Sequence, residues 1–165
     1  MIYPIGIQNF ESLINDGYMY VDKTALVYQM TTTGRYYFLS RPRRFGKSLL
    51  LSTLEAYLSG KKELFKGLAI EKLEHKWEEH PILHLDLNTA KYDEMGSLNH
   101  VLDDSLKKWE EIYGTFPTEV TFALRLKGIV ERAYEKTSHR VVIFVDEYDK
   151  PMLQAIGNEL LQTEY

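Results

Sequence analysis

The chain has 165 residues, of which 44% are hydrophobic and 27% charged, values that predict one globular domain with a hydrophobic core. A net charge of −4 argues against nucleic-acid binding through the overall field of the chain, and the absence of cysteine excludes disulfides, thiolate metal sites and a cysteine nucleophile. We expect a cytoplasmic protein without membrane contact, because we find neither a signal peptide nor a spanning segment.

Helices and one strand are predicted in the first half of the chain. In order, they are a short turn or helix at 8–15, a helix that starts within 21–30, a strand at 36–40, a helix at 47–58 and one or two short helical pieces within 61–80. Asp22 is expected to cap the second of these and Gly34 to end it. The strand prediction rests on the aromatic sequence YYFLS, which stands between Gly34 and Pro42.

The second half predicts two strands and three helices. In order, they are a strand at 81–88 with a polar end at Asp86 and Asn88, a helix with an apolar stripe from Met95 to Ile112, a helix after Pro117 with a stripe from Phe122 to Tyr134, a strand at 141–147 and a helix from Pro151 to Tyr165. The sequence VVIFVDE at 141–147 is typical of a central strand covered on both faces. Alternating strands and helices predict an α/β fold with a parallel sheet.

A phosphate-binding loop is predicted between the strand at 36–40 and the following helix. Gly46-Lys47-Ser48 matches the end of the pattern G-x-x-x-x-G-K-[ST], although Arg41 stands where the pattern has its first glycine. Gly46 would let the backbone approach a phosphate, Lys47 would reach the β and γ phosphates, and Ser48 would offer a hydroxyl to Mg²⁺. The alternative is a solvated basic loop that caps a helix.

Two acids follow the strongest predicted strand. Asp146 and Glu147 lie at its carboxyl end, the edge at which open parallel sheets bind ligands. In NTP hydrolysis the first acid would orient the magnesium shell and the second would polarise the attacking water. The alternative is an ordinary polar strand end.

Other charged residues have structural alternatives as well. Arg41, Arg43 and Arg44 crowd one loop, where either a polyphosphate or surface salt bridges would supply the counter-charge. Asp149 is expected to cap the last helix, and His84 to be a packed histidine instead of a metal ligand.

With both motifs placed, the chain resembles the AAA-ATPase-like domain family of prokaryotic P-loop proteins. The resemblance lies in PIGIQNF (4–10), GYMYVDKTALV (17–27), FLSRPRRFGKSLLLSTL (38–54) and VVIFVDEYDKP (141–151). The loop RPRRFGKS is the form that this family uses, so arginine in place of the first glycine is a family trait. The segment YVDKT is similar to one that lies near the adenine in related ATPases.

The resemblance implies ATP and Mg²⁺ as cofactors and a set of site residues. Catalysis would use Lys47 and Glu147, and Mg²⁺ would be held by Ser48 and Asp146. The nucleotide-binding residues would be Arg43, Arg44, Phe45, Gly46, Lys47, Ser48 and Leu49.

The implied fold is a P-loop NTPase three-layer sandwich in which residues 1–35 lead into a core at 36–165. Such ATPases have the strand order 5-1-4-3-2, and only the first three strands are found here, at 36–40, 82–88 and 141–147. We therefore expect a truncated product, without the helical lid and the restriction-endonuclease-like nuclease domain into which family members continue.

Three functions are compatible with these motifs. The first is an Mg²⁺-dependent ATPase, and the alternative is a nucleotide-binding switch without appreciable hydrolysis. A nucleic-acid-binding fragment would depend on the arginines at 41–44 alone and conflicts with the acidic balance. We expect nucleotide as the partner and nucleic acid only through the missing nuclease-like region, while an oligomer is compatible with the sequence.

Overall fold

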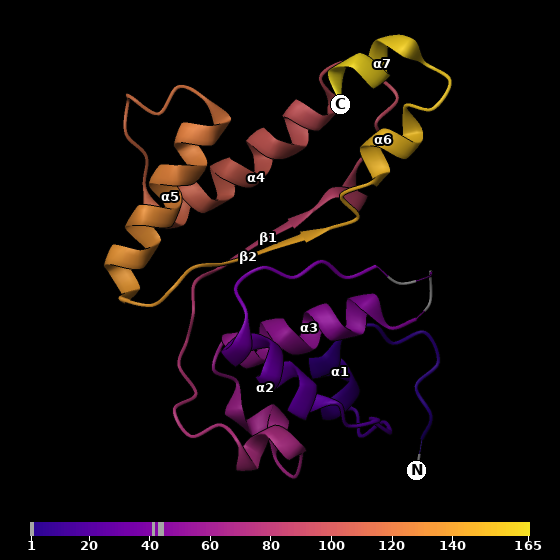
Figure 1. The fold of residues 1–165 in the computed structure, drawn as a ribbon, viewed down its shortest axis with the longest axis vertical. Helices are drawn as coiled ribbons and strands as arrows, with labels where there is room; N and C mark the ends of the chain where they lie inside the picture. Colours follow the sequence, from indigo (N-terminus) through magenta and orange to yellow (C-terminus); the bar gives the residue numbers. More distant parts are fainter. Residues whose placement is uncertain (1, 41, 43–44) are drawn as a thin grey trace. The chain divides into compact units, whose positions relative to one another are not determined.

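The computed structural model describes residues 2–40, 42 and 45–165. The chain forms two compact units, Met1–His80 and Pro81–Tyr165 (Figure 1). Each unit has its own buried side chains. None of the described helices combines the length and apolar composition needed to cross a bilayer.

The first unit is helical. Its elements are α1 (Phe10–Asn15), α2 (Thr24–Thr33), α3 (Lys47–Leu58) and the 3₁₀ turns η1 (Lys62–Phe65) and η2 (Ala69–Lys72). The helices expected at 8–15 and 47–58 and the short pieces within 61–80 are thus confirmed. Aromatic rings form much of the core: the Phe65 ring centroid lies 4.9 Å from that of Phe10 and 5.4 Å from that of Trp77.

Asp22 lies one residue before Lys23, the N-cap of α2, bonds the first residue of this helix and also connects it to η2. One carboxylate oxygen, Oδ1, accepts a hydrogen bond from the Thr24 N–H at 2.8 Å, and the other, Oδ2, accepts one from the Ala69 N–H at 2.7 Å. The helix ends at Gly34, as predicted. The segment YVDKT therefore has a structural role within this unit, because the carboxylate of Asp22 accepts hydrogen bonds from two separate backbone segments.

The strand predicted at residues 36–40 is absent from the structure. All five residues are described and belong to no strand, and the side chains of Tyr36 and Phe38 are 94% and 72% exposed. A strand needs a neighbour for its backbone hydrogen bonds, and among the described residues no β-bridge includes this segment. Instead, the Tyr37 hydroxyl donates to the Met30 carbonyl at 2.6 Å, so this aromatic residue packs back on the end of α2.

The second unit contains a small parallel sheet and its crossover helices. Its elements are β1 (Ile82–Asp86), η3 (Leu87–Thr89), α4 (Ser97–Tyr113), α5 (Phe122–Thr137), β2 (Val142–Asp146), α6 (Lys150–Gln154) and α7 (Glu159–Glu164). The two strands pair in register, with Leu83 opposite Ile143 and Asp86 opposite Asp146. This parallel pairing confirms an α/β arrangement. The strands β1 and β2 correspond to the expected second and third strands, which are neighbours in the expected order.

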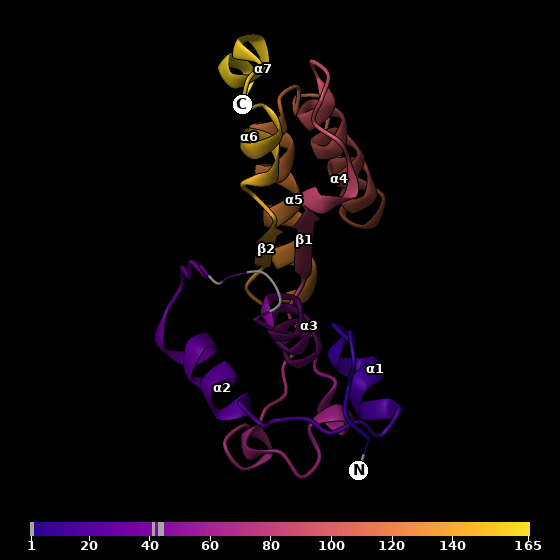
Figure 2. The same ribbon diagram turned by 90° about the vertical axis from the view of Figure 1, so that its right-hand side faces the viewer.

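Helices α4 and α5 pack against each other beside the sheet (Figure 2). Leu106 of α4 and Ile129 of α5 form a buried cluster with Leu83 of β1. Arg125 of α5 joins the helices by donating to both carboxylate oxygens of Glu110, at 2.6 and 2.8 Å. These hydrogen bonds hold the pKa of the Glu110 carboxyl below its usual value.

Two predictions for this unit need correction. Residues 141–147 were expected to form a strand covered on both faces, but Ile143 and Val145 are 46% and 48% exposed. The reason is that α4 packs over β1, while β2 pairs with β1 alone among the described strands. The single helix expected from Pro151 to Tyr165 is two helices, because Gly157 adopts a φ of +89° and the Asn158 side chain caps the start of α7.

Candidate functional site

The predicted phosphate loop ends at Gly46, directly before α3. Gly46 has φ +74° and ψ 23°, in the left-handed region that favours glycine. Its carbonyl accepts the hydrogen bond of Leu50 N–H at 3.0 Å, so the helix starts at once after this residue. Apart from its chain neighbours and the backbone of α3, no atom of the described residues would lie within 4 Å of a Cβ atom placed on Gly46.

The next three predicted site residues form the first turn of α3. Lys47, Ser48 and Leu49 are partly buried. In any α-helix the first N–H groups have no acceptor within the helix, and the aligned peptide dipoles give this end a partial positive charge. The first turn of α3 therefore has the electrostatic character that binds an anion. Of the remaining loop residues, Phe45 is exposed, whereas Arg41, Arg43 and Arg44 lie outside the described residues.

Ser52 holds α3 against the N-terminal segment. Its hydroxyl oxygen accepts a hydrogen bond from Phe10 N–H at 2.9 Å and lies 3.1 Å from the Gln8 carbonyl, to which the hydroxyl can donate. The segment PIGIQNF thus contacts α3 one turn after Ser48. Sequence analysis missed this residue, because a serine inside a helix carries no signal that it bonds a backbone more than 40 positions away.

The two predicted acids lie where β2 ends. Asp146 is the last residue of the strand, and its Oδ1 accepts a hydrogen bond from Glu147 N–H at 2.9 Å. Glu147 has φ +52°, a left-handed conformation that is uncommon for a residue with a side chain. The expected catalytic base is therefore held in a strained turn directly after the strand.

Three polar residues that were not predicted as site residues lie in or next to the segments that follow the two strands: Asp86, Asn88 and Lys150. Asp86 is opposite Asp146 in the register, so the two parallel strands end in neighbouring carboxylates. The Lys150 ammonium donates to the Asn88 carbonyl at 2.8 Å and to its side-chain oxygen at 3.0 Å. The sequence marked Asp86 and Asn88 as the polar end of a strand, but only the register shows what Asp86 faces and only the hydrogen bonds of Lys150 show what Asn88 contacts.

The donor set agrees with Mg²⁺, for which hard oxygen ligands are preferred. Ser48 supplies a hydroxyl and Asp146 a carboxylate, and an ion bound to nucleotide phosphates takes only one or two protein ligands. Within residues 2–40, 42 and 45–165 no group of three or more His, Asp or Glu side chains could hold a metal ion by itself. Because Ser48 and Asp146 belong to different units, their meeting in one site remains a prediction.

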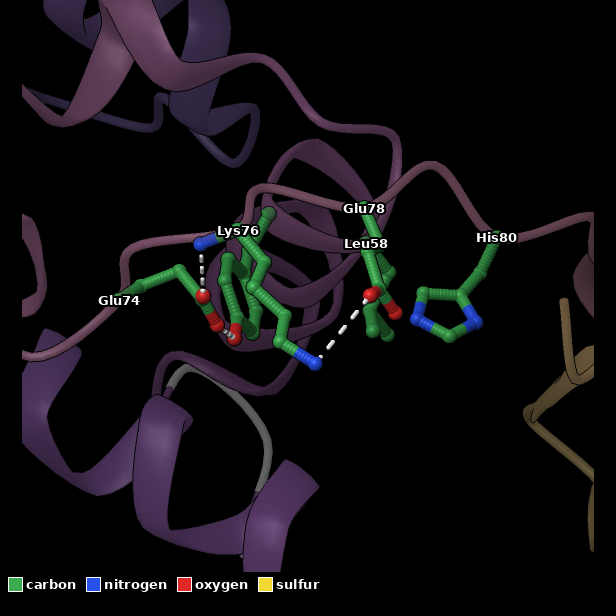
Figure 3. Close-up of a pocket in the computed structure, with 6 residues that line it drawn as sticks. Leu58, Glu74, Lys76, Glu78 and His80 are labelled. Atoms are coloured by element: carbon green, nitrogen blue, oxygen red, sulfur yellow. Dashed lines mark hydrogen bonds and ion pairs between the residues drawn. The ribbon is translucent and has the colours of Figure 1, made fainter.

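A small cavity lies at the other end of α3. Its volume is about 70 Å³, and its lining includes Glu74, Lys76 and His80 (Figure 3). The Tyr57 hydroxyl donates a hydrogen bond to Glu74, and burial together with this carboxylate raises the pKa of Tyr57 far above its usual value. Tyr57 is ten residues from Lys47, or about 15 Å along a helix. The cavity is too small for a nucleotide and is distinct from the predicted loop.

Comparison with known proteins decides the family. The family model described as "Predicted AAA-ATPase" matches residues 4–165. The chain belongs to this AAA-ATPase-like family. The match includes both the loop before α3 and the acids after β2, so the two motifs occur together within one family domain. The family's description names an ATPase, which makes nucleotide binding the activity to test.

A curated relative of this AAA-ATPase-like chain comes from Azotobacter chroococcum mcd 1. It is described as "Uncharacterized protein in vnfD 5'region" and is 38% identical over 154 residues. The alignment covers 91% of this chain and 29% of the relative, so the chain spans less than a third of that protein's length. No solved structure matches the chain.

Proposed function

We propose that this chain is the nucleotide-binding core of an ATPase that hydrolyses ATP with Mg²⁺. The observation that carries the proposal is the left-handed Gly46 directly before the first turn of α3. A left-handed glycine directly before the first turn of a helix, followed by a lysine, is an arrangement that suits a phosphate chain.

In this proposal each residue of the loop has one task. Lys47 binds the β and γ phosphates, while the backbone around Gly46 and Leu49 receives the phosphate oxygens. Ser48 and Asp146 hold Mg²⁺, which when bound neutralises charge on the phosphates. Arg43, Arg44 and Phe45 complete the nucleotide contacts.

Glu147 acts as the general base of the proposed reaction. Its carboxylate accepts a proton from the water that attacks the γ phosphate. This role requires the acids of the second unit to meet the loop of the first, in the three-layer sandwich of a P-loop NTPase with residues 1–35 leading into a core at 36–165. Within the second unit, the parallel pair of β1 and β2 with acids at its carboxyl end supports a ligand site at that end of the sheet.

Isothermal titration with ATP and Mg²⁺ tests the binding step. We expect the wild-type chain to bind and Lys47→Ala to lose binding. Lys66→Ala removes the same charge from an exposed residue of the same unit and should bind like the wild type. Unchanged affinity in Lys47→Ala would overturn the assignment of the loop.

Phosphate release tests the chemical step. Glu147→Gln keeps the size of the side chain and removes its basicity, so we expect it to bind ATP with wild-type affinity and to lose turnover. A wild-type chain that binds ATP without releasing phosphate would instead support the nucleotide-binding switch.

A further inference from the structure

Lys150 makes a bridge between the segments that follow the two strands. Its ammonium donates two hydrogen bonds to Asn88, which lies two residues after the end of β1. One helical turn later, the side-chain oxygen of Gln154 accepts the Tyr92 N–H at 2.7 Å. Helix α6 is thus fastened at two points to residues 88–92, and Figure 1 shows it beyond the ends of both strands.

The backbone of Lys150 completes a turn with Glu147. Its N–H donates to the Glu147 carbonyl at 3.0 Å, and Glu147 N–H in turn donates to Asp146. A hydrogen-bonded path therefore runs from Asn88 through Lys150 to the carbonyl of Glu147, while the Glu147 N–H is bonded separately to Asp146.

This path matters because Glu147 has a conformation that is unfavourable by itself. A non-glycine residue in the left-handed region is strained and persists only where its surroundings hold it. Nothing in the residue type explains φ +52° at this position, since glutamate is not among the residues enriched there. The bonds that end on both sides of Glu147 supply the restraint.

We propose that Lys150 is a positioning residue for Glu147: by bonding Asn88 it holds the turn 147–150, and with it the proposed base, in a fixed place after β2. Lys150 does not touch the nucleotide in this proposal. The proposal rests on the proposed ATPase function for its effect on rate, but the restraint itself is independent of any activity.

The competing explanation is that Lys150 only adds a surface contact to α6. That role would affect stability without changing the backbone at Glu147 or the rate at saturating ATP. The two explanations therefore predict different results for amide exchange at Glu147 and for the turnover rate.

Two readouts on the full chain separate them. Amide hydrogen exchange followed by NMR reports on the N–H groups of Glu147 and Lys150, and steady-state kinetics with a separate ATP titration divides turnover from binding. The variants are Lys150→Met, which keeps the apolar stem and removes the donor, and Lys150→Arg, which restores one. Lys127→Met is the matched control, because Lys127 is an exposed lysine of the same unit that pairs with Glu131 within α5.

We expect both amides to exchange several-fold faster in Lys150→Met, because the local opening of the turn costs less. The kcat should fall between about tenfold and a hundredfold, as for a misplaced catalytic group, while the dissociation constant of ATP stays within about twofold. Lys150→Arg should recover slow exchange and part of the rate, and Lys127→Met should match the wild type.

Unchanged exchange in Lys150→Met would overturn the proposal whatever the activity. So would a loss of affinity as large as the loss in kcat, since that would place Lys150 at the nucleotide. If the wild-type chain hydrolyses no ATP, the proposed ATPase function fails, and the exchange measurement alone still decides whether Lys150 holds the turn.

Discussion

The hydroxyl oxygen of Thr24 accepts a hydrogen bond from the backbone N–H of Ile70 at 3.0 Å, although the two residues are 46 positions apart. Both residues are completely buried, and the same hydroxyl donates to Asp22 at 2.7 Å. This contact joins the first turn of α2 to η2 inside the first unit.

Replacing Thr24 by valine should destabilise the first unit. The two side chains have nearly the same shape, but valine leaves a buried N–H without an acceptor, which costs about 1–3 kcal/mol. Urea denaturation should show this loss in the free energy of unfolding. Thr24→Ser keeps the hydroxyl and is expected to lose less, so equal losses in the two variants would contradict the role of the hydrogen bond.

Asp22 predicts a pH dependence of the same region. Partial burial works to raise the pKa of this carboxyl, but hydrogen bonds from Thr24 and from the Ala69 N–H outweigh it and lower the pKa below its usual value of 3.8. Because the folded pKa is lower than the unfolded one, the stabilisation is fully present above the unfolded pKa and is lost as the pH falls through the folded pKa.

Asp22→Asn is therefore expected to be less stable than the wild type at pH 7 and to approach it as the pH falls through the folded pKa, which lies below 3.8, because the carboxyl group of the folded chain becomes neutral there. Denaturation curves at several pH values measure this difference. Asp16→Asn removes an exposed carboxylate from the same unit and controls for the loss of one negative charge. A gap between wild type and Asp22→Asn that stays constant with pH would contradict the prediction.

Leu83 and Ile143 are paired across the sheet but differ in burial. Leu83 is fully buried against α4 and α5, whereas Ile143 is about half exposed. Leu83→Ala should reduce the free energy of unfolding by about 2–5 kcal/mol, as for a core leucine. Ile143→Ala should cost clearly less, because less apolar surface is lost from the interior. Similar losses would mean that β2 is covered as fully as β1.

Local patterns predicted most elements of this fold. Apolar residues at helical spacing gave α3, α4 and α5, and an unbroken β-branched run gave β2, because these signals lie within one segment. The segment at 36–40 carried the same kind of aromatic signal and formed no strand. Propensity describes how well a residue fits a sheet, but a strand also needs a partner, and no local pattern shows whether one is present.

In the candidate site, too, local motifs could be recognised from the sequence and long-range contacts could not. Gly46, Lys47, Asp146 and Glu147 were found from motifs that combine residue type with a neighbouring element. The position of Asp86 opposite Asp146 follows from strand register, and the contact of Lys150 with Asn88 joins residues 62 positions apart. Such long-range relationships depend on how β1 and β2 align, so a single sequence could mark these residues as polar without revealing what they contact.

Gly46 and Gly67 form a matched pair for testing the loop. Both have a positive φ, +74° and +81°, and beyond its chain neighbours a Cβ on either would meet no atom of the described residues within 4 Å. Alanine should therefore cost each site a similar amount, about 1–2 kcal/mol for the left-handed backbone. Only Gly46 precedes the first turn of α3, so only Gly46→Ala should weaken ATP binding in a calorimetric titration. Equal affinities for the two variants would mean that the left-handed glycine before α3 serves the fold and not a phosphate.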